Sequence, residues 1–133
     1  NCSNLKTVST RALREMGDSV FYKCTSLQEI SIPNTVKSIG EKAFTDCTAL
    51  TRVGIQGATL IKQYAFFGCT ALQYVYMPAS MQTIKYGAFY GCSALTRVFY
   101  KGSYTQWKGI RIEAENDVLK DESKIVYNAN NSY

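Results

Sequence analysis

One apolar template recurs along most of this 133-residue chain and constrains its fold more than any other feature. Residues 39–55 read I-x-x-x-A-F-x-x-C-x-x-L-x-x-V-x-I, and the same spacing returns at residues 61–77 and 84–100. A looser copy covers residues 16–32, and a partial copy begins at Cys2. A period of 22 to 23 residues falls in the range of leucine-rich repeats and predicts a solenoid.

Each repeat divides into two parts with different periodicity. Toward its end, Val53-Gly54-Ile55 alternates inward and outward, which predicts a short strand. Before it, Ile39, Ala43, Phe44 and Cys47 are spaced i, i+4, i+5 and i+8, which places them on one face of a short helical turn. One unit encloses too thin a core to be stable alone, whereas stacked units bury a continuous one. We therefore expect an α/β solenoid with short parallel strands on one face and short helical turns opposite.

The cysteines occupy one position of the template. They are separated by 22, 23, 22 and 23 residues, no C-x2-C pair occurs, and the chain has no histidine, so no metal site is expected. Stacked cysteines have nearly parallel Cα–Cβ bonds and Cβ atoms about 5 Å apart, whereas a disulfide needs about 3.8 Å. We predict a structural cysteine ladder of five buried, reduced thiols: Cys2, Cys24, Cys47, Cys69 and Cys92.

The period ends after Tyr100, which divides the chain into leucine-rich repeats over residues 1–102, about four to five units, and a C-terminal cap and tail over residues 103–133. Ser103 is expected to cap a helix from Tyr104 to Lys108 that places Trp107 over the last repeat. Residues 115–122 are expected to form a short helix, residues 124–127 a strand, and residues 128–133 a frayed tail. At the other end, the chain opens on Asn1-Cys2 without the Ala-Phe segment of the template, which fits either a piece of a longer solenoid or a degenerate first unit.

The sequence contains no catalytic constellation. The absence of histidine excludes a Ser-His-Asp triad and a histidine-activated thiol, and no glycine-rich phosphate loop occurs. The sequence contains no run of about 18 apolar residues, so it predicts no membrane-spanning helix. Five acidic residues near the C-terminus lack the spacing of an EF-hand and are expected to form a solvated cap surface: Glu113, Glu115, Asp117, Asp121 and Glu122. We expect no enzymatic activity, cofactor or metal.

The outward positions of the predicted strands are the candidate binding surface. In the C-terminal half these positions carry arginine and aromatic residues, the types that most often anchor interfaces: Arg52, Tyr74, Tyr76, Arg97 and Phe99. They are predicted to bind a ligand, although strand propensity alone also favours tyrosine and phenylalanine there. A second aromatic row, Tyr22, Phe67 and Tyr90, follows the buried phenylalanine of its unit and is expected to pack between units.

The template resembles the BspA-like, or Treponema pallidum-type, leucine-rich repeats over residues 2–100. The matching positions are Ile32-Pro33, Val36, Ile39, Ala43-Phe44, Cys47, Leu50, Val53 and Ile55. The resemblance implies a right-handed, curved solenoid with its parallel sheet on the concave face. It also implies a secreted or surface-attached bacterial protein that adheres to host matrix or to other cells, and it supplies no catalytic residues.

Three functions remain open at this stage. The first is a recognition module that binds a protein or glycan ligand through the concave face. The second is a structural spacer within a longer surface protein. The third is nucleic-acid binding, which the net charge of +5 permits, but the basic residues are scattered singly and argue against it.

Overall fold

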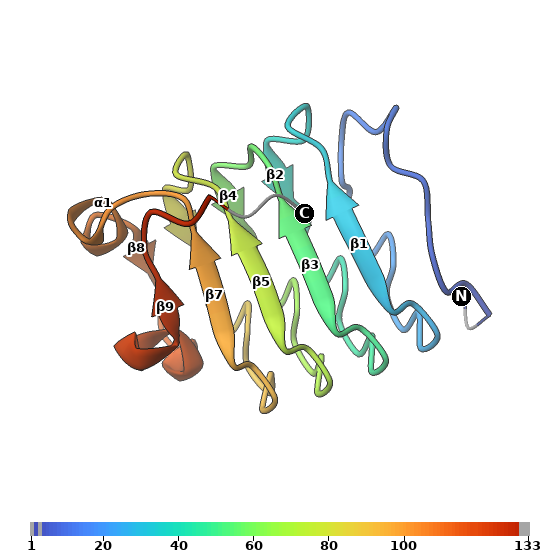
Figure 1. Cartoon of the computed structure of the whole chain (residues 1–133). Coiled ribbons are helices and arrows are strands. Elements are labelled where there is room, and N and C mark those ends of the chain that lie inside the picture. The colour runs from blue at the N-terminus through green and yellow to red at the C-terminus, as the bar shows by residue number, and fades with distance from the viewer. Residues whose placement is uncertain (1, 3, 131–133) are drawn as a thin grey trace.

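A computed structural model describes residue 2 and residues 4–130, and it shows coils of chain stacked side by side along one axis (Figure 1). Two parallel sheets run along the stack. The larger has the strand order β1-β3-β5-β7-β9 and the smaller has the order β2-β4-β6-β8. Successive coils therefore add one strand to each sheet, and the predicted repeat solenoid with parallel strands is confirmed.

The larger sheet contains the strands that the template predicts. It consists of β1 (Glu29–Ile32), β3 (Arg52–Ile55), β5 (Tyr74–Met77), β7 (Arg97–Tyr100) and β9 (Ile125–Val126). The smaller sheet was not predicted, because strands of two residues are too short to show an alternating pattern. It consists of β2 (Ser38–Ile39), β4 (Leu60–Ile61), β6 (Thr83–Ile84) and β8 (Arg111–Ile112).

The expected helical turn after each strand of the smaller sheet is wrong. Lys42 and Asp46 have φ angles of 59° and 60°, and left-handed residues four apart interrupt an α-helix. The backbone N–H groups of this segment instead bond to the next coil: Phe44 N donates to Ala65 O at 2.7 Å, and Asp46 N donates to Phe67 O at 2.8 Å. These turns therefore join neighbouring coils in the way that a sheet joins strands.

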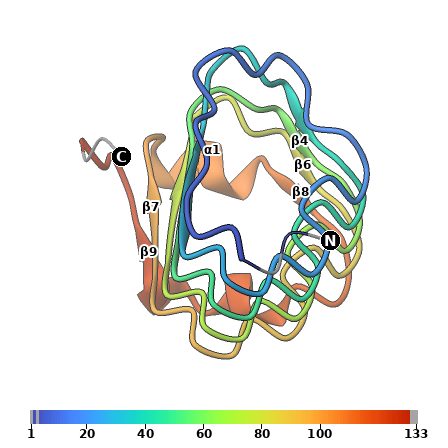
Figure 2. The same cartoon turned by 90° about the vertical axis from the view of Figure 1, so that its right-hand side faces the viewer.

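Identical side chains stack through the core, as the template predicts. The rings of Phe21, Phe44, Phe66 and Phe89 form one stack with centroids 5.0 to 5.3 Å apart. Along the larger sheet, the inward residues Ile30, Val53, Val75 and Val98 are paired in register, and all are buried. Viewed along the axis, the coils superimpose around one shared interior, with the two sheets on opposite sides (Figure 2).

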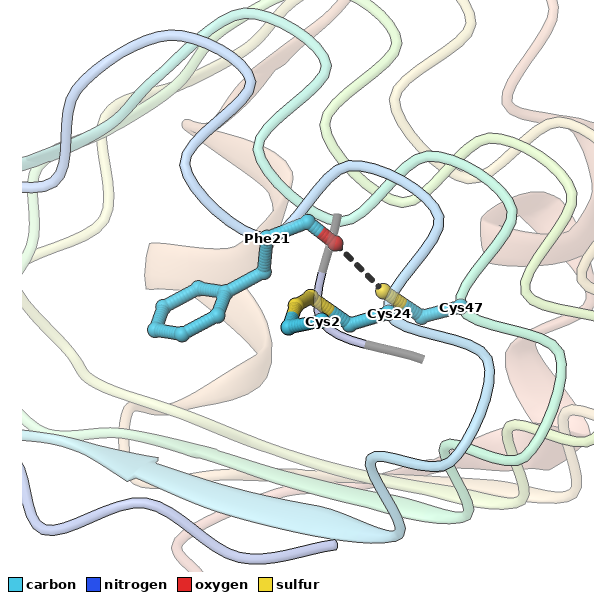
Figure 3. Close-up of a disulfide and its surroundings, with 4 residues drawn as sticks. All are labelled: Cys2, Phe21, Cys24 and Cys47. Atoms are coloured by element: carbon cyan, nitrogen blue, oxygen red, sulfur yellow. Dashed lines mark hydrogen bonds between the residues drawn. A yellow bond between two sulfur atoms is a disulfide. The ribbon is translucent and has the colours of Figure 1, made fainter. Parts of the chain in front are cut away.

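The cysteine ladder is confirmed in part. Cys47, Cys69 and Cys92 are free and buried, and their thiols donate to the carbonyl oxygens of Phe21, Phe44 and Phe66 in the preceding coil at 3.0 to 3.2 Å. The prediction of five reduced thiols is wrong, because Cys2 and Cys24 form a disulfide with their Cα atoms 4.8 Å apart (Figure 3). That separation lies within the range that a disulfide spans. Residues 4–15 contain no strand, so the first coil is not held to the parallel side-chain geometry that the prediction assumed.

The segment after β7 crosses the end of the solenoid. Helix α1 (Tyr104–Lys108) begins after Ser103, whose hydroxyl accepts a hydrogen bond from Gln106 N, and it lies across the interior in the axial view (Figure 2). Trp107 is buried, and its ring lies edge-on to Tyr100 with centroids 5.1 Å apart. The helix expected over residues 115–122 is present as two short 3-10 helices, η1 (Asp117–Lys120) and η2 (Glu122–Lys124).

The frayed tail expected over residues 128–133 needs correction at its start, and its last three residues lie outside the described part of the chain. Residues 128 and 129 are not frayed, because Asn128 N donates to Gly102 O and Ala129 N donates to Tyr100 O, both at 2.9 Å. Asn130 is also part of the expected tail and is exposed, and residues 131–133 lie outside the described residues.

Asn116 completes the turn side of the last repeat. In each earlier coil the N–H of the buried phenylalanine donates to the backbone carbonyl of the next coil's alanine, but Phe89 N donates to the side-chain oxygen of Asn116 at 2.9 Å. The side-chain amide nitrogen of Asn116 donates in turn to Lys85 O and to Glu113 O, both at 2.9 Å. Fully buried, this one side chain provides the hydrogen-bond acceptor that a further repeat would supply.

Candidate functional site

The larger sheet presents two rows of side chains away from the core. In the first row, Glu29, Arg52, Tyr74 and Arg97 are paired in register on β1, β3, β5 and β7. Both arginines are exposed and Tyr74 is half-buried. Neighbouring parallel strands lie about 4.8 Å apart, so side chains in one row are within reach of their neighbours.

The second row carries the aromatic contacts. Ser31, Gly54, Tyr76, Phe99 and Val126 are paired along it. The rings of Tyr76 and Phe99 stack with centroids 4.8 Å apart and an interplanar angle of 20°, and Tyr74 lies 6.1 Å from Phe99 between the rows. These contacts hold the three rings against one another while leaving each of them partly exposed.

The structure thus brings together all five residues predicted for the ligand-binding patch. We call them the sheet patch: Arg52, Tyr74, Tyr76, Arg97 and Phe99. They come from three adjacent strands, and the N-terminal continuation of the two rows is small or acidic, with Ser31 and Glu29. Thr7 and Ser9 would extend the rows further, but they lie in a coil without strand structure.

The thiols offer no chemistry at this surface. Burial raises the pKa of Cys47 to about 11 and of Cys92 to about 12, with smaller opposing effects from backbone hydrogen bonds. Burial also raises the pKa of Cys69, and the neighbouring Cys92 and Cys47 add to the increase. A nucleophilic cysteine needs a lowered pKa and access to solvent, and these three have neither.

Four of the five acidic residues near the C-terminus, all but Glu115, contact lysine, arginine or serine groups, among them Asp117, which lies 3.6 Å from Lys120. Glu122 pairs with Lys108 at 2.6 Å, and Asp121 accepts hydrogen bonds from the backbone N and the hydroxyl of Ser123. Glu113 lies 3.9 Å from both Lys85 and Arg111. Among residues 2 and 4–130, no three His, Cys, Asp or Glu side chains gather in a way that could hold a metal ion. In the same residues, no helix combines the length and apolarity needed to cross a bilayer.

The second aromatic row only partly packs between units. Phe67 stacks on Tyr90 with centroids 5.4 Å apart, as expected, yet Tyr22 and Tyr90 are 39% and 50% exposed. Sequence reasoning missed Tyr64 and Tyr86, which join this row through edge-on contacts. The signal for them was Gly87, a glycine at the template position that Tyr64 occupies one coil earlier.

Comparison with known proteins identifies the repeat. A family model described as the BspA type leucine rich repeat region matches residues 1–110 in six copies. None of the curated proteins matches the chain.

Solved structures of leucine-rich repeat proteins are similar to the chain. A leucine-rich repeat protein from Bacteroides ovatus is 31% identical, with a TM-score of 0.70 over 96% of this chain and 31% of its own. The leucine-rich repeat protein of T. pallidum is 31% identical, with a TM-score of 0.64 over 74% of this chain and 44% of its own. A leucine-rich cell surface protein from Faecalibacterium prausnitzii is 26% identical, with a TM-score of 0.62 over 81% of this chain and 35% of its own. The chain thus spans less than half the length of each of these structures. The repeated template, its buried positions and the match to the family model agree with one another. The chain therefore belongs to the BspA-type leucine-rich repeat family.

Proposed function

We propose that the chain is a non-enzymatic recognition domain of a secreted or surface-attached bacterial protein, and that it adheres to a protein or glycan ligand through the sheet patch on its concave face. The observation that carries the proposal is the register of the patch. Two arginines flank Tyr74 in one row, and Tyr76 stacks on Phe99 in the next.

The aromatic side chains of the sheet patch are already ordered before a ligand binds. Binding costs free energy when side chains lose rotamers at the interface, and tyrosine and phenylalanine lose little because they have only two side-chain torsions. Here the rings are also held by one another on strands of a hydrogen-bonded sheet. Arginine adjacent to such rings supplies charge-assisted hydrogen bonds to carboxylates or sulfates.

The location is supported by two observations. Disulfides persist in oxidising compartments and at cell surfaces, and the Cys2–Cys24 bond fits such a location. The protein from F. prausnitzii that resembles this chain is described as a cell surface protein.

The test uses variants of the patch and matched variants from the same two rows. Tyr76→Ala and Arg97→Ala should lower affinity for a ligand found on a matrix-protein and glycan array by about tenfold or more each, the loss typical of interface anchors. Glu29→Ala and Ser31→Ala, on β1 of the same rows, should leave affinity unchanged. If the patch variants bind as well as the wild type while their urea unfolding curves are unaltered, the sheet patch is not the binding surface.

A spacer function is the alternative that one observation favours. The chain covers only 31% to 44% of its structural neighbours, so each neighbour has further segments that repeats could hold apart. A spacer would give no hit on the array but would change the reach of the parent protein when a repeat is deleted. Nucleic-acid binding through the basic, aromatic patch would instead show affinity that falls steeply with salt.

A further inference from the structure

A hollow lies among the turns, built from residues other than those of the sheet patch. It has a volume of about 300 Å³ and is lined by Tyr64, Phe67, Tyr86, Gly87, Tyr90 and Glu115. We call it the turn pocket. Four aromatic rings and one carboxylate line it, and two of the rings, Tyr86 and Tyr90, are 41% and 50% exposed.

Glycine at position 87 makes room for the pocket. Gly87 has a φ of +61°, and a Cβ atom there would lie 2.9 Å from Cε1 of Tyr64, so only glycine lets the Tyr64 ring lie against this backbone. That ring stands nearly perpendicular to two neighbours, at 90° to Phe67 and 88° to Tyr86. The rings therefore form a corner rather than one flat platform.

The chain holds Glu115 beside these rings. Its neighbours are fixed on both sides: Ala114 O accepts a hydrogen bond from Gly87 N at 3.0 Å, and the buried side chain of Asn116 bonds to Phe89 N. Glu115 itself has a φ of 66°. None of the ion pairs among the described residues involves its carboxylate. Partial desolvation and then the charge of Glu115 raise the pKa of Tyr86, and both residues line the turn pocket.

The coil of residues 16–32 shows what such a ring attracts. Tyr22 occupies the template position of Tyr90, and the ammonium group of Lys23 lies 5.4 Å from the centroid of its ring. The residue after Tyr90 is Gly91, so position 91 does not supply the cation that Lys23 places over the equivalent ring in the coil of residues 16–32.

We propose that the turn pocket binds an organic ammonium group, with quaternary ammonium as the preferred form. The negative faces of several aromatic rings attract a cation, and a ring-lined corner suits a bulky, weakly hydrated ammonium better than a compact one. Glu115 supplies the opposite charge. The site goes beyond the recognition function proposed for the sheet patch and shares no residue with it.

The experiment is a titration of the folded chain with choline chloride, followed through the backbone amide signals of Gly87 and Gly91 by two-dimensional NMR. Sodium chloride at matched ionic strength corrects for salt, and 3,3-dimethylbutan-1-ol provides an uncharged probe of the same shape. Choline should give a saturable shift of both signals, and the alcohol should bind at least several-fold more weakly. Glu115→Gln and Tyr90→Ala should each weaken choline binding by about 2- to 5-fold, as expected for one exposed cation–π or charge contact.

Two matched variants act as controls. Tyr104→Ala removes a tyrosine that is also 50% exposed but lies on α1, and Glu29→Gln removes a carboxylate on β1. Both should bind choline like the wild type. Equal binding of the uncharged probe, no saturable shift of Gly87, or unchanged affinity in Glu115→Gln would each overturn the proposal. Because Tyr76→Ala leaves the turn pocket intact, its effect on the array ligand reports on the sheet patch alone.

Discussion

Replacing Asn116 by alanine should destabilise the C-terminal end of the solenoid more than any exposed polar substitution. The change removes three hydrogen bonds, those that Asn116 makes with Phe89 N, Lys85 O and Glu113 O, although Lys85 O keeps a second bond from Ala88 N. Each such hydrogen bond contributes about 0.5–1.5 kcal/mol net, so the expected loss is roughly 2–4 kcal/mol. The free energy of unfolding of a domain is about 5–15 kcal/mol, which makes this a large fraction of the total.

Two measurements check the prediction at different scales. Urea unfolding gives the change in free energy, and amide hydrogen exchange locates it. The amide of Phe89 should lose more protection than that of Phe66, because Phe66 N donates to the backbone carbonyl of Ala88 and needs no side chain.

Asn34→Ala serves as the matched control for Asn116→Ala. Asn34 is an exposed asparagine, and Asn34→Ala should change stability by less than about 0.5 kcal/mol. If Asn116→Ala also stays within about 0.5 kcal/mol, and Phe89 exchanges as slowly as in the wild type, the Asn116 side chain does not take the place of a further coil.

Three further predictions concern the core and the disulfide. The buried thiols should react with Ellman's reagent only after unfolding. Burial raises the pKa of Cys47 from an ordinary value of 9.0 to about 11. As the pH rises above 9, the unfolded state therefore loses its thiol protons before the folded state does. The free energy of unfolding, measured by urea titration at a series of pH values, should fall over that range. The Cys2–Cys24 bond closes a loop of 22 residues, so reducing it should lower the free energy of unfolding by about 3 kcal/mol through the entropy of the open loop. If five thiols titrate in denaturant without reductant, the bond is absent. The buried Tyr100 hydroxyl has no hydrogen-bond partner among the described residues. Tyr100→Phe should therefore be neutral or stabilising by up to about 1 kcal/mol in thermal unfolding. A marked loss of stability would show that the hydroxyl has a partner.

The sequence was a good guide wherever the template repeats. Phe44 and Val53 lie in the core because their positions recur with one period, and a period of 22 to 23 residues only buries its apolar residues by stacking. The residues of the sheet patch were also found, since alternation along a strand determines which side chains point away from the core.

The remaining features depend on single coils rather than on the repeat. The spacing of Ile39, Ala43 and Phe44 fits a helix, but the left-handed residue Lys42 carries no sequence signal of its own; glycine at the equivalent position 87 was the available warning. The Cys2–Cys24 bond was missed because the argument from stacking applies only to coils held in strand register. Asn116 and Glu115 lie beyond the last full template, where no second copy exists for comparison.

The hydrogen bonds of the buried Asn116 side chain bear on how a solenoid of this kind could change its length. The Asn116 side chain accepts the hydrogen bond from Phe89 N that each earlier coil directs to a backbone carbonyl of the next coil, so this contact does not depend on the number of units before it. Duplication or loss of an internal unit would then alter the length of the solenoid and the area of its sheets while the contacts of Asn116 stay intact. A lineage that varies its repeat count could in this way adjust the length of the solenoid while it keeps the same contacts at Asn116.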